Sequence, residues 1–302
     1  FLCMAIKGLL VQRGLSGQVF EANYNQVSRQ LCITDSELRN FKPDIVVVWE
    51  TAEHWWMRDD DVQSRLLAVG SYAKACNCKL LYINLASIRD GVFGSYVEQN
   101  VSFVSQIRLF NAGLDALTKS CPNLYIVDFA SLVADIGRAF LFDAATFMLS
   151  DMVLTPDGHV AWARQIVDII ATLRGQVTKC VVVDLDNTLW GGVIGEDGLS
   201  GIVIGEHDLG KAYANFQRLL KRLKKRGVLL AVCSKNDEAI AREPFERHPN
   251  MILRMDDFAC FVANWETKAD NIAHIQKVLN IGMESFVFLD DNPAERAIIR
   301  RA

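Results

Sequence analysis

The chain has 302 residues, a hydrophobic content of 51%, a charged content of 23% and a formal net charge of −4. This length exceeds what one hydrophobic core usually supports, so two domains are expected. The acidic balance, with a pI of about 5.8, argues against generic nucleic-acid binding, which requires a basic surface. No apolar stretch approaches the ~20 residues needed to span a bilayer, so no membrane partner is expected.

The eight cysteines are scattered through apolar contexts along the chain. A small secreted protein would use them as a disulfide framework, so this distribution predicts a reducing, cytoplasmic location. Cys76 and Cys78 form a C-x-C pair without a second pair or a nearby His. We expect two ordinary thiols there and no structural zinc site.

Strand-like and helical segments alternate along the first half of the chain, which is typical of a parallel α/β sheet. Short, almost continuous apolar runs predict strands covered on both faces, at 44–49, 79–86 and 123–130. Helices are predicted at 1–14, around 61–75, around 97–119 and from Thr155 to about Arg174. Thr155 is a suitable N-cap with Pro at the first helical position, and 175–179 is expected to be a linker.

The second half continues the alternation. In chain order it predicts a strand at 180–185, glycine-rich turns at 191–205, a helix at 209–226, a strand at 228–233, a short helix at 237–247, a connector, a helix near 267–280 and a strand at 285–289. Strands that alternate with helices predict a doubly wound parallel sheet.

Polar side chains follow three of these strands at their carboxyl ends. Asp184 and Asp186 follow the first strand, and their i, i+2 spacing directs both carboxylates to the same side. Ser234 follows the second strand, and a pair of aspartates at 290–291 follows the last. Because the carboxyl ends of parallel strands share one edge of a sheet, these groups should meet there, with Lys268 close by at the start of the preceding helix.

This set of groups is what phosphoryl transfer through an aspartyl phosphate requires. One carboxylate can be phosphorylated, a second can transfer protons, and hydroxyl and ammonium groups can hold the phosphoryl oxygens. Mg²⁺ prefers carboxylate and carbonyl oxygens, which Asp184, the carbonyl of Asp186 and Asp290 would supply. Each group taken singly is a common turn residue, but four elements in this order favour a site.

Several segments of the second half resemble a known family: VVDLDNTLWGGVIGEDG, FQRLLKRLKKRGVLLAVCSKND, FERHPNMILRMDDF, NWETKADNI and SFVFLDDNPAER. The order DLDNT, SK, ETK and DD is similar to the four motifs of the haloacid dehalogenase superfamily of Mg²⁺-dependent phosphotransferases. The longer segments are similar to the FkbH-like enzymes of polyketide biosynthesis. The resemblance implies an enzyme that takes 1,3-bisphosphoglycerate, removes both phosphates and passes the glyceryl group as a thioester to an acyl carrier protein.

The resemblance also implies roles for the matching residues. Asp184 corresponds to the nucleophile and Asp186 to the acid/base, while Lys268 is both a catalytic residue and a phosphate ligand. The residues expected to hold Mg²⁺ are Asp184, Asp186, Asp290 and Asp291. The residues expected to bind substrate are Thr188, Ser234, Lys235, Asn236 and Asn292.

A thioester product requires a thiol, and Cys233 beside Ser234 is the best candidate for a covalent glyceryl carrier. The alternative is that Cys233 is the last apolar residue of its strand and faces away from Ser234, because adjacent strand residues point to opposite faces. A strand end that turns can break the alternation, so both interpretations stay open.

The first half is similar, more weakly, to the SGNH-hydrolase-like domain that accompanies FkbH-like enzymes, with LTPDGHVAWA as its last block. Ser150 and Val153 stand where a catalytic Asp and His would be, and Ala52 where an oxyanion Asn is expected, so we predict a catalytically degenerate domain. The expected organisation is an SGNH/flavodoxin-like three-layer domain at 1–175 and a haloacid dehalogenase-like domain with a minimal cap at 178–302.

Two further functions remain as alternatives. A plain Mg²⁺-dependent phosphatase of the same superfamily, acting on a small phosphorylated metabolite or a phosphoprotein, would need no cysteine. A non-catalytic module that docks a carrier protein would need none of the site chemistry. The basic run KRLKKR at 221–226 would suit an acidic carrier protein, but basic residues near a helix C-terminus are also ordinary solvated side chains.

Overall fold

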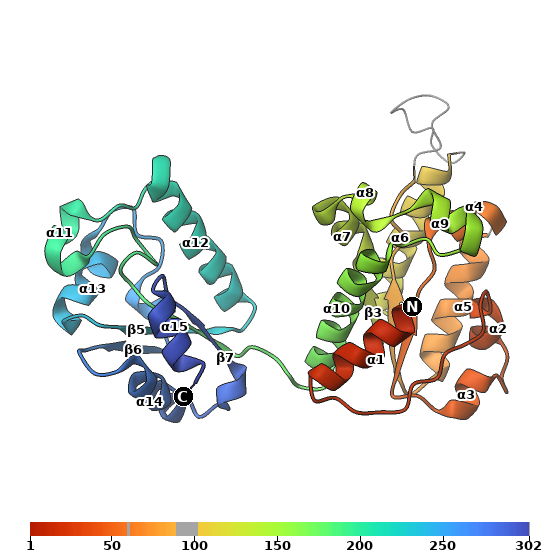
Figure 1. The fold of residues 1–302 in the computed structure, drawn as a ribbon, viewed down its shortest axis with the longest axis horizontal. Coiled ribbons are helices and arrows are strands. Elements are labelled where there is room, and N and C mark those ends of the chain that lie inside the picture. The colour runs from red at the N-terminus through yellow and green to blue at the C-terminus, as the bar shows by residue number, and fades with distance from the viewer. Residues whose placement is uncertain (59–60, 89–101, 302) are drawn as a thin grey trace. The chain divides into compact units, whose positions relative to one another are not determined.

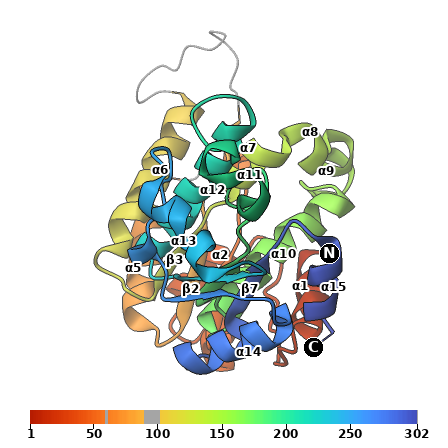
Figure 2. The same ribbon diagram turned by 90° about the vertical axis from the view of Figure 1, so that its left-hand side faces the viewer.

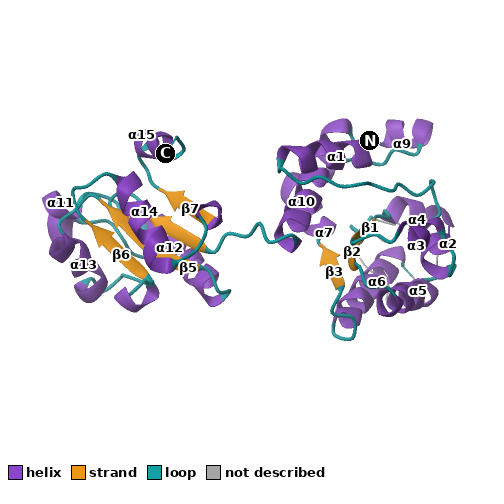
Figure 3. Cartoon of the chain, turned by 90° about the horizontal axis from the view of Figure 1, so that it is seen from below, coloured by secondary structure: helices purple, strands orange, loops and turns teal. Residues whose placement is uncertain are grey.

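The computed structural model describes residues 1–58, 61–88 and 102–301. The chain divides into two compact units, Phe1–Arg174 and Gly175–Ala302. Each unit contains one parallel sheet, drawn in orange in Figure 3, with helices around it. A search of the described helices for one that is both long and apolar enough to cross a bilayer finds none.

The first unit has three strands and ten helices among its described residues. The strands are β1 (Ile45–Val48), β2 (Lys79–Ile83) and β3 (Leu124–Val127). The helices are α1 (Leu2–Gln12), α2 (Val27–Cys32), α3 (Glu37–Phe41), α4 (Ala52–Arg58), α5 (Val62–Ala75), α6 (Phe103–Thr118), α7 (Phe129–Ile136), α8 (Arg138–Leu141), α9 (Ala144–Ser150) and α10 (Pro156–Leu173).

The sheet of the first unit is buried on both faces, which explains its continuous apolar runs. Its order is β1-β2-β3, and all neighbours are parallel. In β2, Leu80 and Tyr82 belong to the core that includes Phe110 of α6. The intervening Leu81 and Ile83 belong to a second core that includes Trp162 and other residues of α10. One layer of helices therefore covers each face.

The N-cap predicted for the last helix of this unit is confirmed. The Thr155 hydroxyl accepts a hydrogen bond from the Gly158 N–H at 3.0 Å and donates one to the Phe140 carbonyl at 2.9 Å. We predict that Thr155→Ala lowers the free energy of unfolding by about 1 kcal/mol, because a helix donor and a carbonyl lose their partner. Thr155→Ser, which keeps the hydroxyl, should lose less than half of that in urea denaturation. Equal losses in both variants would contradict the capping role.

The second unit has four strands among its described residues. They are β4 (Cys180–Val183), β5 (Leu229–Ser234), β6 (Cys260–Ala263) and β7 (Phe286–Leu289). The helices are α11 (Ile194–Gly201), α12 (Asp208–Lys225), α13 (Glu238–Arg247), α14 (Lys268–Leu279) and α15 (Pro293–Ile299), with short 3₁₀ turns η1 (Met255–Asp257) and η2 (Met283–Ser285).

The four strands form a parallel sheet in the order β6-β5-β4-β7, so β4 lies in its interior. Val181 and Val183 of β4 face a core shared with α12 and α13. Val182 faces the other side, where Ile272 and Ile275 of α14 cover the sheet. Figures 1 and 2 both show α14 on the opposite side of the strands from α12 and α13. This layering confirms the predicted parallel α/β class.

Several predicted segments differ from the structure. The turns expected at 191–205 contain α11, whose glycines hide the helical pattern and whose backbone kinks at Gly198 with φ 68°. The connector after α13 contains β6, a four-residue edge strand within the apolar run 258–263, which was not predicted as a strand from the sequence. The strand expected at 123–130 ends at Val127, because Asp128 caps α7 by accepting from the Ser131 N–H. Of the helix expected at 97–119, residues 97–101 lie outside the described chain.

Candidate active site

The parallel register brings the predicted polar groups to one edge of the second sheet. Val183 pairs with Val232 of β5 on one side and with Leu289 of β7 on the other. The residues that follow β4 and β7 are Asp184 and Asp290, and the Asp184 N–H donates to the Leu289 carbonyl at 2.9 Å. The sheet hydrogen bonding therefore fixes these two carboxylates at the same level.

Lys268 joins the two carboxylates. It is the first residue of α14, and its Nζ lies 2.8 Å from Asp184 Oδ2 and 2.5 Å from Asp290 Oδ2. The residues are 4%, 7% and 8% exposed, respectively. A lysine at a helix N-terminus opposes the helix dipole, so its position there is explained by the two acids it neutralises and not by helix stability.

Burial and pairing act in opposite directions on these groups. Burial raises the pKa of Asp184 above its ordinary value, and the nearby Lys268, together with hydrogen bonds from Ser234 and Leu185, offsets only part of this rise. Burial would by itself lower the pKa of Lys268, but Asp184 and Asp290 outweigh it and raise that pKa. Lys268 is therefore protonated at neutral pH, and ionised Asp184 is held at a cost in free energy.

The site has the oxygen ligands that Mg²⁺ prefers. One oxygen each from Asp184, Asp290 and Asp291 lies within 4.8 Å of the others. Asp184 Oδ1 is buried and has no hydrogen-bond partner among the described residues. A buried carboxylate oxygen without a partner is costly, and a divalent cation among three acids would satisfy it. The residues present thus fit a magnesium ion.

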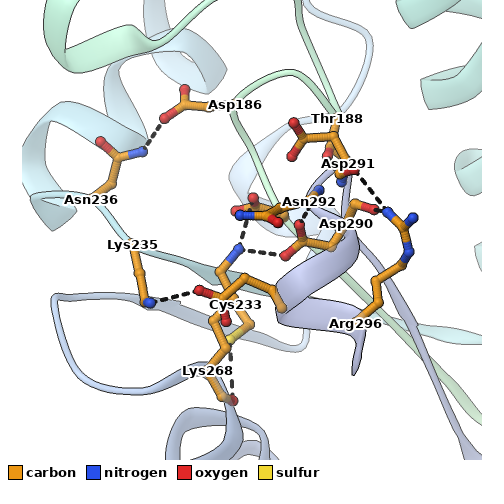
Figure 4. Close-up of polar contacts among 12 residues, drawn as sticks. Asp186, Thr188, Cys233, Lys235, Asn236, Lys268, Asp290, Asp291, Asn292 and Arg296 are labelled. Atoms are coloured by element: carbon orange, nitrogen blue, oxygen red, sulfur yellow. Dashed lines mark hydrogen bonds and ion pairs between the residues drawn. The ribbon is translucent and has the colours of Figure 1, made fainter. Parts of the chain in front are cut away.

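An open cavity of about 320 Å³ lies beside these acids. Thr188, Asp290, Asp291 and Arg296 line it, and the Thr188 hydroxyl accepts from the Asp291 N–H at 3.2 Å. Arg296 donates to the carbonyls of both Asp290 and Asp291 (Figure 4). Arg296 was not predicted from the sequence, although its place in the first turns of the helix after DDNP could have indicated that it braces this loop.

Asp186 lies outside the three-acid group. Its Oδ1 accepts from the Trp190 indole Nε1 at 3.0 Å and from the Ile194 N–H at 2.9 Å, and its Oδ2 accepts from Asn236 Nδ2 at 2.7 Å. Figure 4 shows the carboxylate directed toward Asn236. Trp190 was also missed, and its position four residues after Asp186 within DLDNTLW is the signal that could have found it.

The remaining predicted substrate ligands lie at the same edge with protein partners. Ser234 ends β5 and is 1% exposed. Lys235 Nζ pairs with Glu295 of α15 at 2.6 Å. The Asn292 side-chain oxygen caps α15 by accepting from the Ala294 N–H at 2.9 Å. The structure brings these residues together, and their contact with a substrate stays a prediction.

Cys233 is a core residue in this structure, as the second interpretation of the sequence held. It is 0% exposed and packs with Val182, Ala231 and Ile275 on the α14 side of the sheet. Its Sγ lies 3.7 Å from the Lys268 carbonyl oxygen, and burial raises the pKa of the thiol to about 12. A protonated and inaccessible sulfur cannot attack a substrate carbon. The predicted role as glyceryl carrier is therefore not supported.

We predict that Cys233→Ala retains phosphate release within about twofold and loses about 1 kcal/mol of stability through the small cavity it leaves. Comparison of steady-state kinetics and urea denaturation with the parent protein tests both statements. A loss of turnover in a variant that is still folded would restore the thiol to the mechanism.

The first unit contains His159, the histidine of the LTPDGHVAWA block. His159 is 7% exposed, its Nδ1 lies 2.9 Å from the Thr155 carbonyl oxygen, and burial lowers its pKa. His159 is thus a local hydrogen-bonding residue at the start of α10. A buried polar cluster was missed: Glu50 accepts from the Tyr82 hydroxyl at 2.9 Å and pairs with Arg58 and Arg65.

Comparisons with known proteins give one family and a similar solved structure. Residues 1–171 match the family described as "FkbH, N-terminal domain". A crystal structure of the N-terminal part of the protein BF1531 from Bacteroides fragilis, containing a phosphatase domain complexed with Mg, is similar with 40% identity and a TM-score of 0.94. The similarity covers 99% of this chain and 83% of that one. A search of curated proteins found no match.

Proposed function

The chain belongs to the FkbH N-terminal domain family, and on that premise we propose that its second unit is a Mg²⁺-dependent phosphatase of the haloacid dehalogenase type. The observation that carries the proposal is Asp184 itself. One of its oxygens is paired with Lys268, while the other is buried, without a hydrogen bond and within reach of two further acids. The similar Bacteroides fragilis structure contains Mg with a phosphatase domain.

The reaction would divide between the residues as follows. Asp184 attacks phosphorus and forms an acyl phosphate, while the bond to the leaving oxygen breaks. Asp186 gives that oxygen a proton and later takes one from the water that hydrolyses the aspartyl phosphate. Lys268 and Ser234 would hold phosphoryl oxygens. The three acids Asp184, Asp290 and Asp291 would hold Mg²⁺, which supplies positive charge that neutralises the phosphoryl group.

We propose further that the substrate is 1,3-bisphosphoglycerate and that the glyceryl group passes to an acyl carrier protein, as in polyketide biosynthesis. Family membership supports this step. The described cysteines of the second unit do not offer an exposed thiol at the active edge, since Cys180 and Cys233 are fully buried and Cys260 begins its strand at the other end. The carrier's own thiol would therefore attack the acyl carbon, forming the C–S bond as inorganic phosphate leaves, and Asp184 would take the second phosphate.

Intact-mass analysis tests both the phosphatase and the glyceryl transfer. The protein is incubated with 1,3-bisphosphoglycerate, Mg²⁺ and a carrier protein that bears phosphopantetheine. We expect a glyceryl adduct on the carrier, no adduct on this chain, and release of phosphate. Phosphate release without a carrier adduct would leave a plain phosphatase. The absence of both phosphate release and an adduct would refute the proposed enzyme.

A further inference from the structure

We infer that Asn236 is a positioning residue for Asp186, which it holds together with Trp190 and the backbone of Ile194. This deepens the proposed function and rests on it. Asn236 was predicted to be a substrate ligand, but its amide is 2.7 Å from Asp186 Oδ2 and the residue is 4% exposed. A carboxylate only accepts hydrogen bonds, so the amide nitrogen faces it and the donor is identified by chemistry as well as by distance.

The parallel register explains why Asn236 reaches Asp186. β4 and β5 are neighbours that run in the same direction and end together. Asp184 and Asp186 are spaced i, i+2 after β4, and Ser234 and Asn236 have the same spacing at the end of β5. Asn236 is thus carried next to Asp186, to which its side-chain amide donates at 2.7 Å.

The three donors to Asp186 come from separate segments of the chain. The Trp190 indole belongs to the turn after β4 and is 0% exposed, the Ile194 N–H is at the start of α11, and Asn236 follows β5. A carboxylate with two donors on one oxygen and a third on the other keeps one rotamer, whereas one with a single donor can swing. These three donors therefore preorganise the Asp186 carboxyl group, which must meet the leaving oxygen.

The dependence of kcat/KM on the leaving group distinguishes a role in proton transfer from a purely structural role. A poor leaving group such as an alkoxide depends on proton donation, whereas 4-nitrophenolate leaves without much help. In Asn236→Ala we expect kcat/KM for glycerol 3-phosphate to fall about 30-fold and that for 4-nitrophenyl phosphate less than about threefold. Asn250→Ala, which removes an amide hydrogen bond to Ile204, is the matched control and should lower neither.

Equal losses on both esters, or no loss, would overturn the inference. If the parent protein releases phosphate from neither ester and none from 1,3-bisphosphoglycerate, the proposed phosphatase fails instead. A second measurement then still tests whether Asn236 and Trp190 bind Asp186. In a ¹H–¹⁵N spectrum, Asp186→Ala should shift the indole N–H resonance of Trp190 and the side-chain amide of Asn236. Unchanged resonances would show that neither group is bound to Asp186 in solution.

Discussion

Replacing Asp184 with Asn should lower phosphate release on the order of 10⁴-fold, because the amide keeps the shape of the side chain but cannot attack phosphorus. The measurement is kcat for a phosphate ester in saturating Mg²⁺, with the fold checked by circular dichroism. Asp256, a carboxylate in the turn η1, is the control, and Asp256→Asn should keep parental turnover. Activity above about a tenth of the parent in Asp184→Asn would exclude this residue as the nucleophile.

The same substitution should not destabilise the metal-free protein. Because burial raises the pKa of Asp184 above its unfolded value, its protonated form stabilises the fold at low pH, and this contribution is lost as the pH rises through the folded pKa. At pH 7 the ionised carboxylate therefore carries a penalty that Asn lacks. We expect the metal-free variant to melt at a higher temperature than the parent, and Mg²⁺ to raise the Tm of the parent more than that of the variant.

Lys268→Met should be both inactive and strongly destabilised. Its removal leaves Asp184 and Asp290 buried without their common cation, and breaking a buried ion pair on one side costs about 3–5 kcal/mol. Urea denaturation in the absence of Mg²⁺ measures the loss. Part of it should return at low pH, where a buried carboxyl is protonated, and part on addition of Mg²⁺, which replaces the missing charge.

Lys235→Met is the matched control for stability at the same edge of the sheet. Its ion pair with Glu295 is partly open to solvent, with 42% of the lysine side chain exposed, and such pairs contribute about 0–1 kcal/mol. A large gap between the two methionine variants is therefore expected. If Lys268→Met were no less stable than Lys235→Met, the buried acids would not depend on this lysine.

The elements that form the site were predictable because their signals are local. The run VVV before Asp184 marks a buried strand, and the i, i+2 carboxylates follow from its end. Alternation of strands and helices then places Asp184, Asp290 and Lys268 at one edge through the known rules of parallel sheets. In the structure, Lys268 Nζ lies 2.8 Å from Asp184 Oδ2 and 2.5 Å from Asp290 Oδ2.

The parts that were not predictable depend on side-chain direction at strand ends. Nothing in CSKN decides whether Cys233 or Ser234 faces the site, because the alternation can break where a strand turns. Only the packing of Cys233 against α14 settles it. The sequence likewise predicts Asn236 to be a substrate ligand, whereas its hydrogen bond to Asp186 depends on the register between β4 and β5. The edge strand β6 was missed although CFVA is an apolar run, because so short a run does not by itself distinguish a strand from other buried structure.

The most direct test of the central claim is to trap the covalent intermediate. The protein is mixed with ³²P-labelled substrate and Mg²⁺, quenched in acid within milliseconds, digested and mapped by mass spectrometry. We predict label on Asp184 in the parent. With 4-nitrophenyl phosphate, whose leaving group needs little proton donation, we predict a larger amount of label in Asp186→Asn, because the water that hydrolyses the aspartyl phosphate then lacks its base. Label on another residue, or phosphate release without any labelled aspartate, would contradict the account.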